Sequence, residues 1–173
     1  MTTDSEAFWQ FSIDRYGRDG VSELCIAWQD TLGVDVNLVL FCIWVGQNGC
    51  RIPELVLQDC ISGPAGTWQR DIVQPLRNAR RAMKDWQRDS QHDVEALRQR
   101  VKDLELECER LTQHVLIDTT AGSLKPDASL AENSEQLRQA AMDNLKVYFR
   151  LLAPPDAGRL FAEIATLVDT CID

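Results

Sequence analysis

The sequence predicts an all-α fold, a compact helical bundle followed by a coiled-coil-like helical hairpin. Apolar residues recur at steps of three and four through most of the chain, and glycines and prolines separate these periodic segments. The chain has 173 residues, 45% of them hydrophobic, which is enough to fill a core. We expect a helical N-terminal domain over residues 4–89, a coiled-coil hairpin over 90–153 and a C-terminal helix over 154–173.

Two short helices are expected at the start of the chain. The first carries Phe8 and Trp9 and ends near Gly17. The second has an apolar stripe that begins at Val21, and Gly33 is placed to stop it.

The run Leu38–Val45 is apolar on all sides, and this pattern alone fits either a buried strand or a buried central helix. We favour the helix, because the neighbouring segments are helical and no partner strand is visible. Asp35 can cap its start, and Gly46 to Gly49 can end it. The run is far shorter than the roughly 20 residues of a membrane-spanning helix.

This first part of the chain resembles a known family. The resemblance covers about residues 8–88 and rests on Phe8-Trp9-x-Phe11, Tyr16, Val21, Gln29-Asp30, Gly33, Asp35-Val36-Asn37, Leu40-Phe41-Cys42 and Trp44. These residues are similar to those of small uncharacterised bacterial proteins, labelled conserved hypothetical or domain of unknown function. The resemblance implies a bacterial origin and a helical fold, and it implies no activity, cofactor or substrate.

The segment from Trp68 to Asp89 predicts an amphipathic helix with one basic side. Residues 64–90 have 6 basic and 3 acidic residues, whereas the regions before and after each carry a net charge of −6 within a chain of −9. The basic stripe consists of Arg77, Arg80, Arg81, Lys84 and Arg88. On the other side lie Trp68, Ile72, Leu76, Ala79, Met83 and Trp86, which we expect to face inward. The stripe either binds phosphates or an acidic surface, or forms ion pairs with the acidic parts of the same chain.

The next segment has an unbroken heptad pattern, which is typical of a coiled coil. Its expected partner-binding seam is Val94, Leu97, Val101, Leu104, Cys108, Leu111 and Val115. A parallel copy of this helix would place Arg100 near Glu105, and an antiparallel copy would place Arg100 near Glu107, so both arrangements are compatible in charge. A polar loop over 118–129 leads to another long helix, which we expect to fold back on the heptad helix. The charges oppose this pairing, because the acidic start of the second helix would lie beside acidic residues of the heptad helix.

Residues for catalysis or metal binding are scarce. The two histidines, His92 and His114, lie on one expected helix about 33 Å apart and cannot share a site within the chain. We expect no metal, no cofactor and no catalytic residues, and we expect the six cysteines to be reduced and mostly buried. A ligand pocket is an alternative interpretation of five residues near the central helix, Trp9, Trp28, Asp35, Asn37 and Trp44, which otherwise belong to the core or to helix caps.

The sequence therefore favours a cytoplasmic, non-enzymatic interaction or regulatory adaptor protein. Its heptad helix would bind a protein partner or form a homodimer, and no membrane contact is expected. An RNA- or DNA-associated regulator using the basic stripe is the first alternative, although the net charge of −9 argues against a chain that coats nucleic acid. A small-ligand binder or enzyme with the pocket named above is the second.

Overall fold

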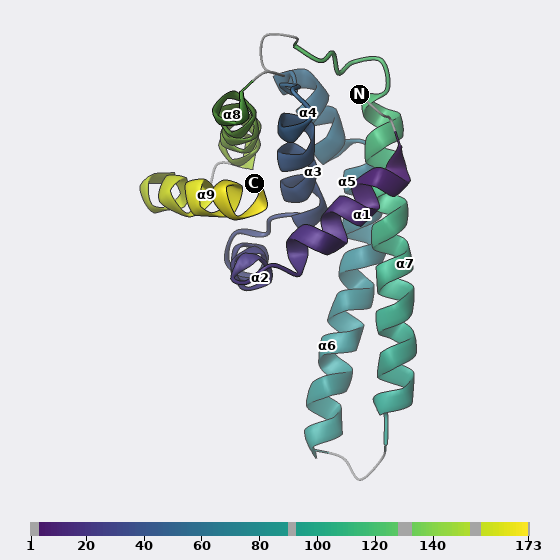
Figure 1. Cartoon of the computed structure of the whole chain (residues 1–173). Coiled ribbons are helices and arrows are strands. Elements are labelled where there is room, and N and C mark those ends of the chain that lie inside the picture. The colour runs from purple at the N-terminus through teal and green to yellow at the C-terminus, as the bar shows by residue number, and fades with distance from the viewer. Residues whose placement is uncertain (1–3, 90–92, 128–132, 153–156, 173) are drawn as a thin grey trace.

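Helices make up most of the residues that the computed structural model describes, which are 4–89, 93–127, 133–152 and 157–172 (Figure 1). No strand occurs in these ranges, and the predicted all-α class is confirmed. None of the described helices is long and apolar enough to cross a membrane. In chain order the helices are α1 (Ser5–Tyr16), α2 (Val21–Leu32), α3 (Val36–Gln47), α4 (Glu54–Ser62), α5 (Pro64–Trp68), the π-helical turn η1 (Gln69–Val73), α6 (Gln74–Asp89), α7 (Glu95–Thr120), α8 (Ser134–Leu152) and α9 (Ala157–Cys171).

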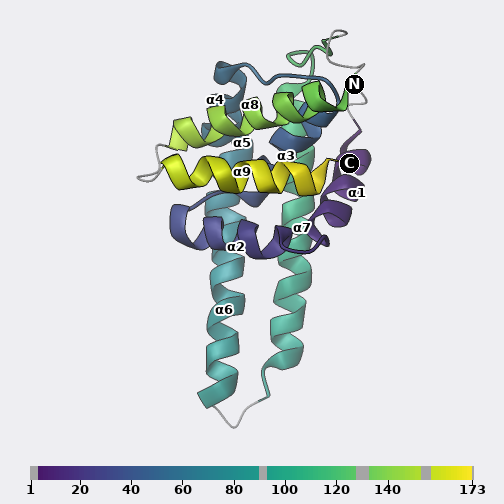
Figure 2. The same ribbon diagram turned by 60° about the vertical axis from the view of Figure 1, so that its left-hand side comes forward.

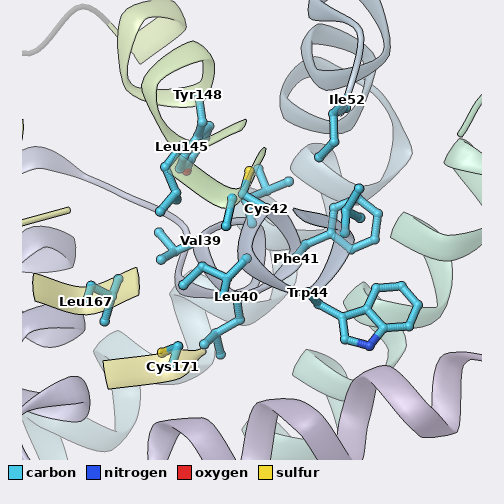
Figure 3. Packing of buried hydrophobic residues seen from close by; sticks show 14 of the residues in the cluster. Val39, Leu40, Phe41, Cys42, Trp44, Ile52, Leu145, Tyr148, Leu167 and Cys171 are labelled. Atoms are coloured by element: carbon cyan, nitrogen blue, oxygen red, sulfur yellow. The ribbon is translucent and has the colours of Figure 1, made fainter. Parts of the chain in front are cut away.

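Helix α3 is the centre of the core, and its residues from Asn37 to Gly46 are all buried. The predicted central helix is thus confirmed, with Asp35 as its N-cap. The Asp35 carboxylate accepts a hydrogen bond from the backbone N–H of Asn37 at 2.9 Å. Figure 3 shows how other helices surround α3: Leu145 and Tyr148 of α8 lie on one side of it, and Leu167 and Cys171 of α9 lie on another.

The preceding helix, α2, ends where the sequence predicts. Its C-cap is Gly33 in the left-handed conformation, with φ of 68°, which a residue without a side chain adopts at little cost. The chain then turns through two residues into α3.

Helix α8 lies directly against α3. The side-chain amide of Asn144 donates to the carbonyls of Cys42 and Cys50 and accepts from the N–H of Ile52, so it binds both α3 and the segment after it. Close approach is possible at Gly46, where a Cβ atom added to the glycine would lie 2.4 Å from the Cα of Ala141. The absence of a side chain at Gly46 therefore sets how closely these two helices pack.

Helix α7 packs along α6, and the two form a long antiparallel hairpin that extends beyond the other helices (Figures 1 and 2). This differs from the expected hairpin over 90–153, in which α7 would pair with the helix that follows it. Helix α8 lies on α3 instead. A heptad pattern shows which side of a helix is apolar, but it does not select the helix that covers that side.

The C-terminal part of α7 and the helices α8 and α9 share one hydrophobic core with the N-terminal helices. Leu116 and Ile117 of α7, Leu145 of α8 and Ile164 of α9 belong to the same buried cluster as α3. The core therefore runs across the expected division into three parts. The expected boundaries, at 89–90 and 153–154, fall at or beside residues outside the described ranges.

A π-helical turn connects α5 to α6. It spans Gln69–Val73 and lies just before Pro75, which has no N–H to donate to a carbonyl one turn earlier. Arg70 is in this turn and bonds to the carbonyl of Ile61 and to the hydroxyl of Thr67, so it does not continue the basic stripe of α6.

Gly46→Ala should destabilise the fold, because the new methyl group would meet the backbone of Ala141. We expect the free energy of unfolding to fall by about 1–3 kcal/mol, although alanine favours helix more than glycine does. Urea denaturation followed by circular dichroism measures this. The matched control is Gly17→Ala, whose methyl group has no atom closer than 3.4 Å, and an equal loss in both variants would contradict the explanation.

Candidate interaction site on the α6–α7 hairpin

The inner side of the hairpin holds a buried cluster of charges. The guanidinium of Arg77 donates to Glu105 at 3.0 Å through Nε, and it donates to Glu109 through Nη2. Arg80 also donates to Glu105. Arg77 and Glu105 are each only 5% exposed. A charge in such a place is tolerated only when it is paired, so this cluster fixes how α6 and α7 face each other.

The arginines shift the acidity of the two glutamates in different ways. Burial alone would raise the pKa of Glu105, but the hydrogen bonds from Arg80 and Arg77 outweigh it and the pKa is lowered. Burial raises the pKa of Glu109, and the attraction of Arg77 only partly offsets this. Glu105 is therefore the carboxylate that the two arginines hold ionised most firmly.

Two residues of the basic stripe, Arg77 and Arg80, turn inward toward α7, which corrects the expectation that the apolar side of this helix would face the interior. Arg77 and Arg80 bind α7, and Arg81 forms an ion pair with Asp30 of α2 at 2.8 Å. Lys84 is exposed, and the side chain of Arg88 lies outside the described part of the chain. The expected inward residues Ile72, Ala79 and Trp86 are exposed, whereas Trp68, Leu76 and Met83 are only partly buried. Pairing of buried charge prevails here over the amphipathic pattern of a single helix.

The heptad seam of α7 is divided between two sides of the helix. Cys108 is buried, and Val94, Val101 and Val115, which share its heptad position, are partly buried. The other position forms an exposed row, Leu97 (48%), Leu104 (47%) and Leu111 (45%). Three of the seven seam residues are therefore nearly half exposed in the single chain.

Helix α6 adds apolar surface beside this row. Trp86 is 59% exposed. Because each residue of an α-helix adds about 100° of rotation, Trp86 lies on the side of α6 opposite Arg77, about 180° away. The helices are antiparallel and Arg80 meets Glu105, so Trp86 lies close to the level of Leu97. We use the name hairpin face for Ile72, Trp86, Leu97, Leu104 and Leu111.

A cavity of about 390 Å³ lies on the other flank of α7 and is bounded by α1, α2, α3, α6 and α7. Lys102, Leu106 and Gln113 line it from α7, about 180° around that helix from the leucine row. On its floor the amide of Gln113 donates to Ser12 at 3.1 Å and to Asn37 at 2.9 Å. The cavity and the hairpin face are thus separate surfaces that share one helix.

The structure brings only part of the sequence-predicted pocket together. Trp9 and Asn37 line the cavity. Trp28 is buried elsewhere and donates its indole N–H to Glu163 of α9 at 2.7 Å. Trp44 packs against the ring of Phe8 in the core, and Asp35 serves as a helix cap.

Several residues that line the cavity could not be predicted from the apolar pattern around the central helix, because they come from other helices. Arg77, Glu109 and Gln113 come from the hairpin, which the sequence places with other partners. The sequence gives no signal for Gln113, because this residue lies outside the heptad seam and only the structure shows that it is buried.

Arg77→Met should destabilise the protein strongly, because it leaves Glu105 and Glu109 buried with one arginine fewer. We expect a loss of about 3–5 kcal/mol in the free energy of unfolding. Urea denaturation provides the measurement. The matched control is Arg81→Gln, which removes a half-exposed pair with Asp30 and should cost at most about 1 kcal/mol. Similar losses in the two variants would contradict the role of the buried cluster.

Asp35 should make stability depend on pH, because burial raises its pKa from 3.8 to about 6. The folded state then binds this proton more tightly than the unfolded state, so stability should fall as pH rises from about 4 to about 6. Asp35→Asn keeps a capping side chain and should lack this part of the fall. Urea midpoints for both proteins across this range measure the difference, and parallel curves would exclude Asp35 as its source.

Comparison with known proteins places the chain in a family without assigning it an activity. No curated protein and no solved structure was found to match it. One family model, described as protein of unknown function (DUF2390), matches residues 7–116, which run from α1 into α7 and extend past the expected range of 8–88. The matched segment includes the α6–α7 pair and its buried charge cluster. The chain therefore belongs to this family of proteins of unknown function.

Proposed function

We propose that this chain is a non-enzymatic interaction protein, a regulatory adaptor that self-associates through the hairpin face. The observation that carries the proposal is the row Leu97, Leu104 and Leu111, which is nearly half exposed at strict heptad spacing. Such a row is the repeating contact of helices that pack together. A second copy of the chain is the occupant that fits it best.

An antiparallel second copy matches the row to itself. With a two-fold axis beside Leu104, this residue meets Leu104 of the other copy, and Leu97 meets Leu111. A two-fold contact needs a surface that is complementary to itself, and the even spacing of the row provides one.

The charges beside the row favour the same arrangement. In the antiparallel register Arg100 lies near Glu107 of the second copy, and both side chains are exposed and have no ion pair within the described residues. A parallel copy would need Glu105, which is already held by Arg77 and Arg80. Each exposed pair contributes only about 0.2–1 kcal/mol, so these charges select the register more than they supply affinity.

Trp86 of α6 and Ile72 of the π-helical turn η1 extend the contact. Trp86 lies near the level of Leu97, so in the antiparallel register it approaches the end of the second hairpin where Ile72 and Leu111 are exposed. Two hairpins then form a four-helix arrangement in which the apolar sides of all four helices are covered.

The cytoplasm is the compartment that we propose, on the basis of the cysteines. None of the six is in a disulfide, and all are buried. Proteins of oxidising compartments use cysteines mainly in disulfides, so six cysteines without a disulfide suit a reducing compartment.

The nucleic-acid alternative loses its main support. Arg77, Arg80 and Arg81 are engaged by carboxylates of the same chain, and a phosphate would have to displace those partners. No observation on the described residues favours this function over the interaction role.

Leu104→Asp should convert the dimer to a monomer, because it places two carboxylates beside the two-fold axis. Light scattering coupled to size exclusion, at high micromolar concentration, measures the mass. Leu55→Asp is the matched control, since Leu55 is exposed on α4 and lies outside the hairpin. A wild-type chain that remains monomeric would contradict self-association and leave a different protein as the partner of the hairpin face.

Crosslinking and charge exchange test the register. Leu104→Cys should form a disulfide-linked dimer on mild oxidation, Leu97→Cys alone should not, and a mixture of Leu97→Cys with Leu111→Cys should. Arg100→Glu should weaken the dimer, and adding Glu107→Arg in the same chain should restore it. Efficient crosslinking of Leu97→Cys alone would indicate a parallel contact.

A further inference from the structure

The cavity beside α7 has the size and lining of a site for a small molecule. Its volume of about 390 Å³ falls within the roughly 300–1,000 Å³ of typical ligand pockets. Trp9, Leu40 and Leu106 give it apolar walls. These walls suit a flat apolar body about the size of a fused two-ring system.

The charges around the cavity leave positive groups in excess. Both carboxylates that line it, Glu105 and Glu109, are already bound by arginines. Lys102 lines the cavity from α7 and has no ion pair within the described ranges. Nη1 of Arg77 is buried and has no hydrogen-bond partner there. The unused capacity is therefore a cationic donor, which an anionic acceptor would satisfy.

One unused acceptor accompanies these donors. Gln113 is buried, and while its amide N–H group binds Ser12 and Asn37, its carbonyl oxygen Oε1 has no donor among the described residues. A buried acceptor without a donor is unfavourable, so the floor of the cavity favours a ligand that brings an N–H or O–H group.

We infer that the cavity binds a small carboxylic acid with a flat apolar body and one hydrogen-bond donor. The carboxylate faces Arg77 and Lys102, the ring system lies against Trp9 and Leu106, and the donor of the ligand faces Gln113. This site is independent of self-association, because the hairpin face lies on the opposite flank of α7.

Isothermal titration calorimetry with three probes of similar size tests this chemistry on the full chain. Indole-3-acetate has both the carboxylate and an N–H donor, 1-naphthylacetate lacks the donor, and tryptamine carries a positive charge in place of the negative one. We expect indole-3-acetate to bind about fivefold or more tighter than 1-naphthylacetate, and at least about tenfold tighter than tryptamine. No detectable binding of indole-3-acetate, or tryptamine binding equally well, would overturn the inference.

Two pairs of variants locate the binding. Leu106→Trp fills the cavity and should abolish binding of indole-3-acetate, whereas Leu55→Trp on α4 should leave it unchanged. Lys102→Gln should weaken binding about fivefold. Leu104→Asp should bind indole-3-acetate as the wild type does, because Leu104 lies on the other flank. Undiminished binding to Leu106→Trp would overturn the assignment to this cavity, whatever the outcome for the dimer.

Discussion

The buried pairing of Arg77 with Glu105 and Glu109 is the constraint on which the arrangement of the hairpin depends. Charges without partners are far more costly inside a protein than apolar side chains are at its surface. Helix α6 therefore turns Arg77 and Arg80 toward α7, and Trp86, on the far side of the helix from Arg77, turns outward. The exposed apolar surface of this chain is thus a direct consequence of how its charges are neutralised.

Local signals in the sequence were sufficient for the helices but not for their packing. Asp35 and Gly33 act through their own backbone neighbours, so the start of α3 and the end of α2 could be predicted from the residues present. The orientation of α6 could not, because it depends on two glutamates about 30 residues away, on a helix that the sequence pattern paired with other partners. Most of the cavity could not be predicted for the same reason. Of the five residues predicted to form a pocket, only Trp9 and Asn37 line it.

Helix α7 serves different purposes on different sides. One side packs on α6, the next lines the cavity through Lys102 and Gln113, and the opposite flank carries the leucine row. Its C-terminal turns, with Leu116, are anchored in the common core. Because the hairpin face and the cavity lie on opposite flanks of α7, the two surfaces share no side chain.

The π-helical turn before Pro75 sets how α6 is rotated about its own axis, and so which of its side chains face α7. A π turn holds one residue more than an α turn, and one residue corresponds to about 100° of rotation. Shortening this turn by one residue would rotate α6 by about a quarter turn and carry Arg77 away from both glutamates. The number of residues between Trp68 and Pro75 therefore helps to set which side of α6 faces the glutamates of α7.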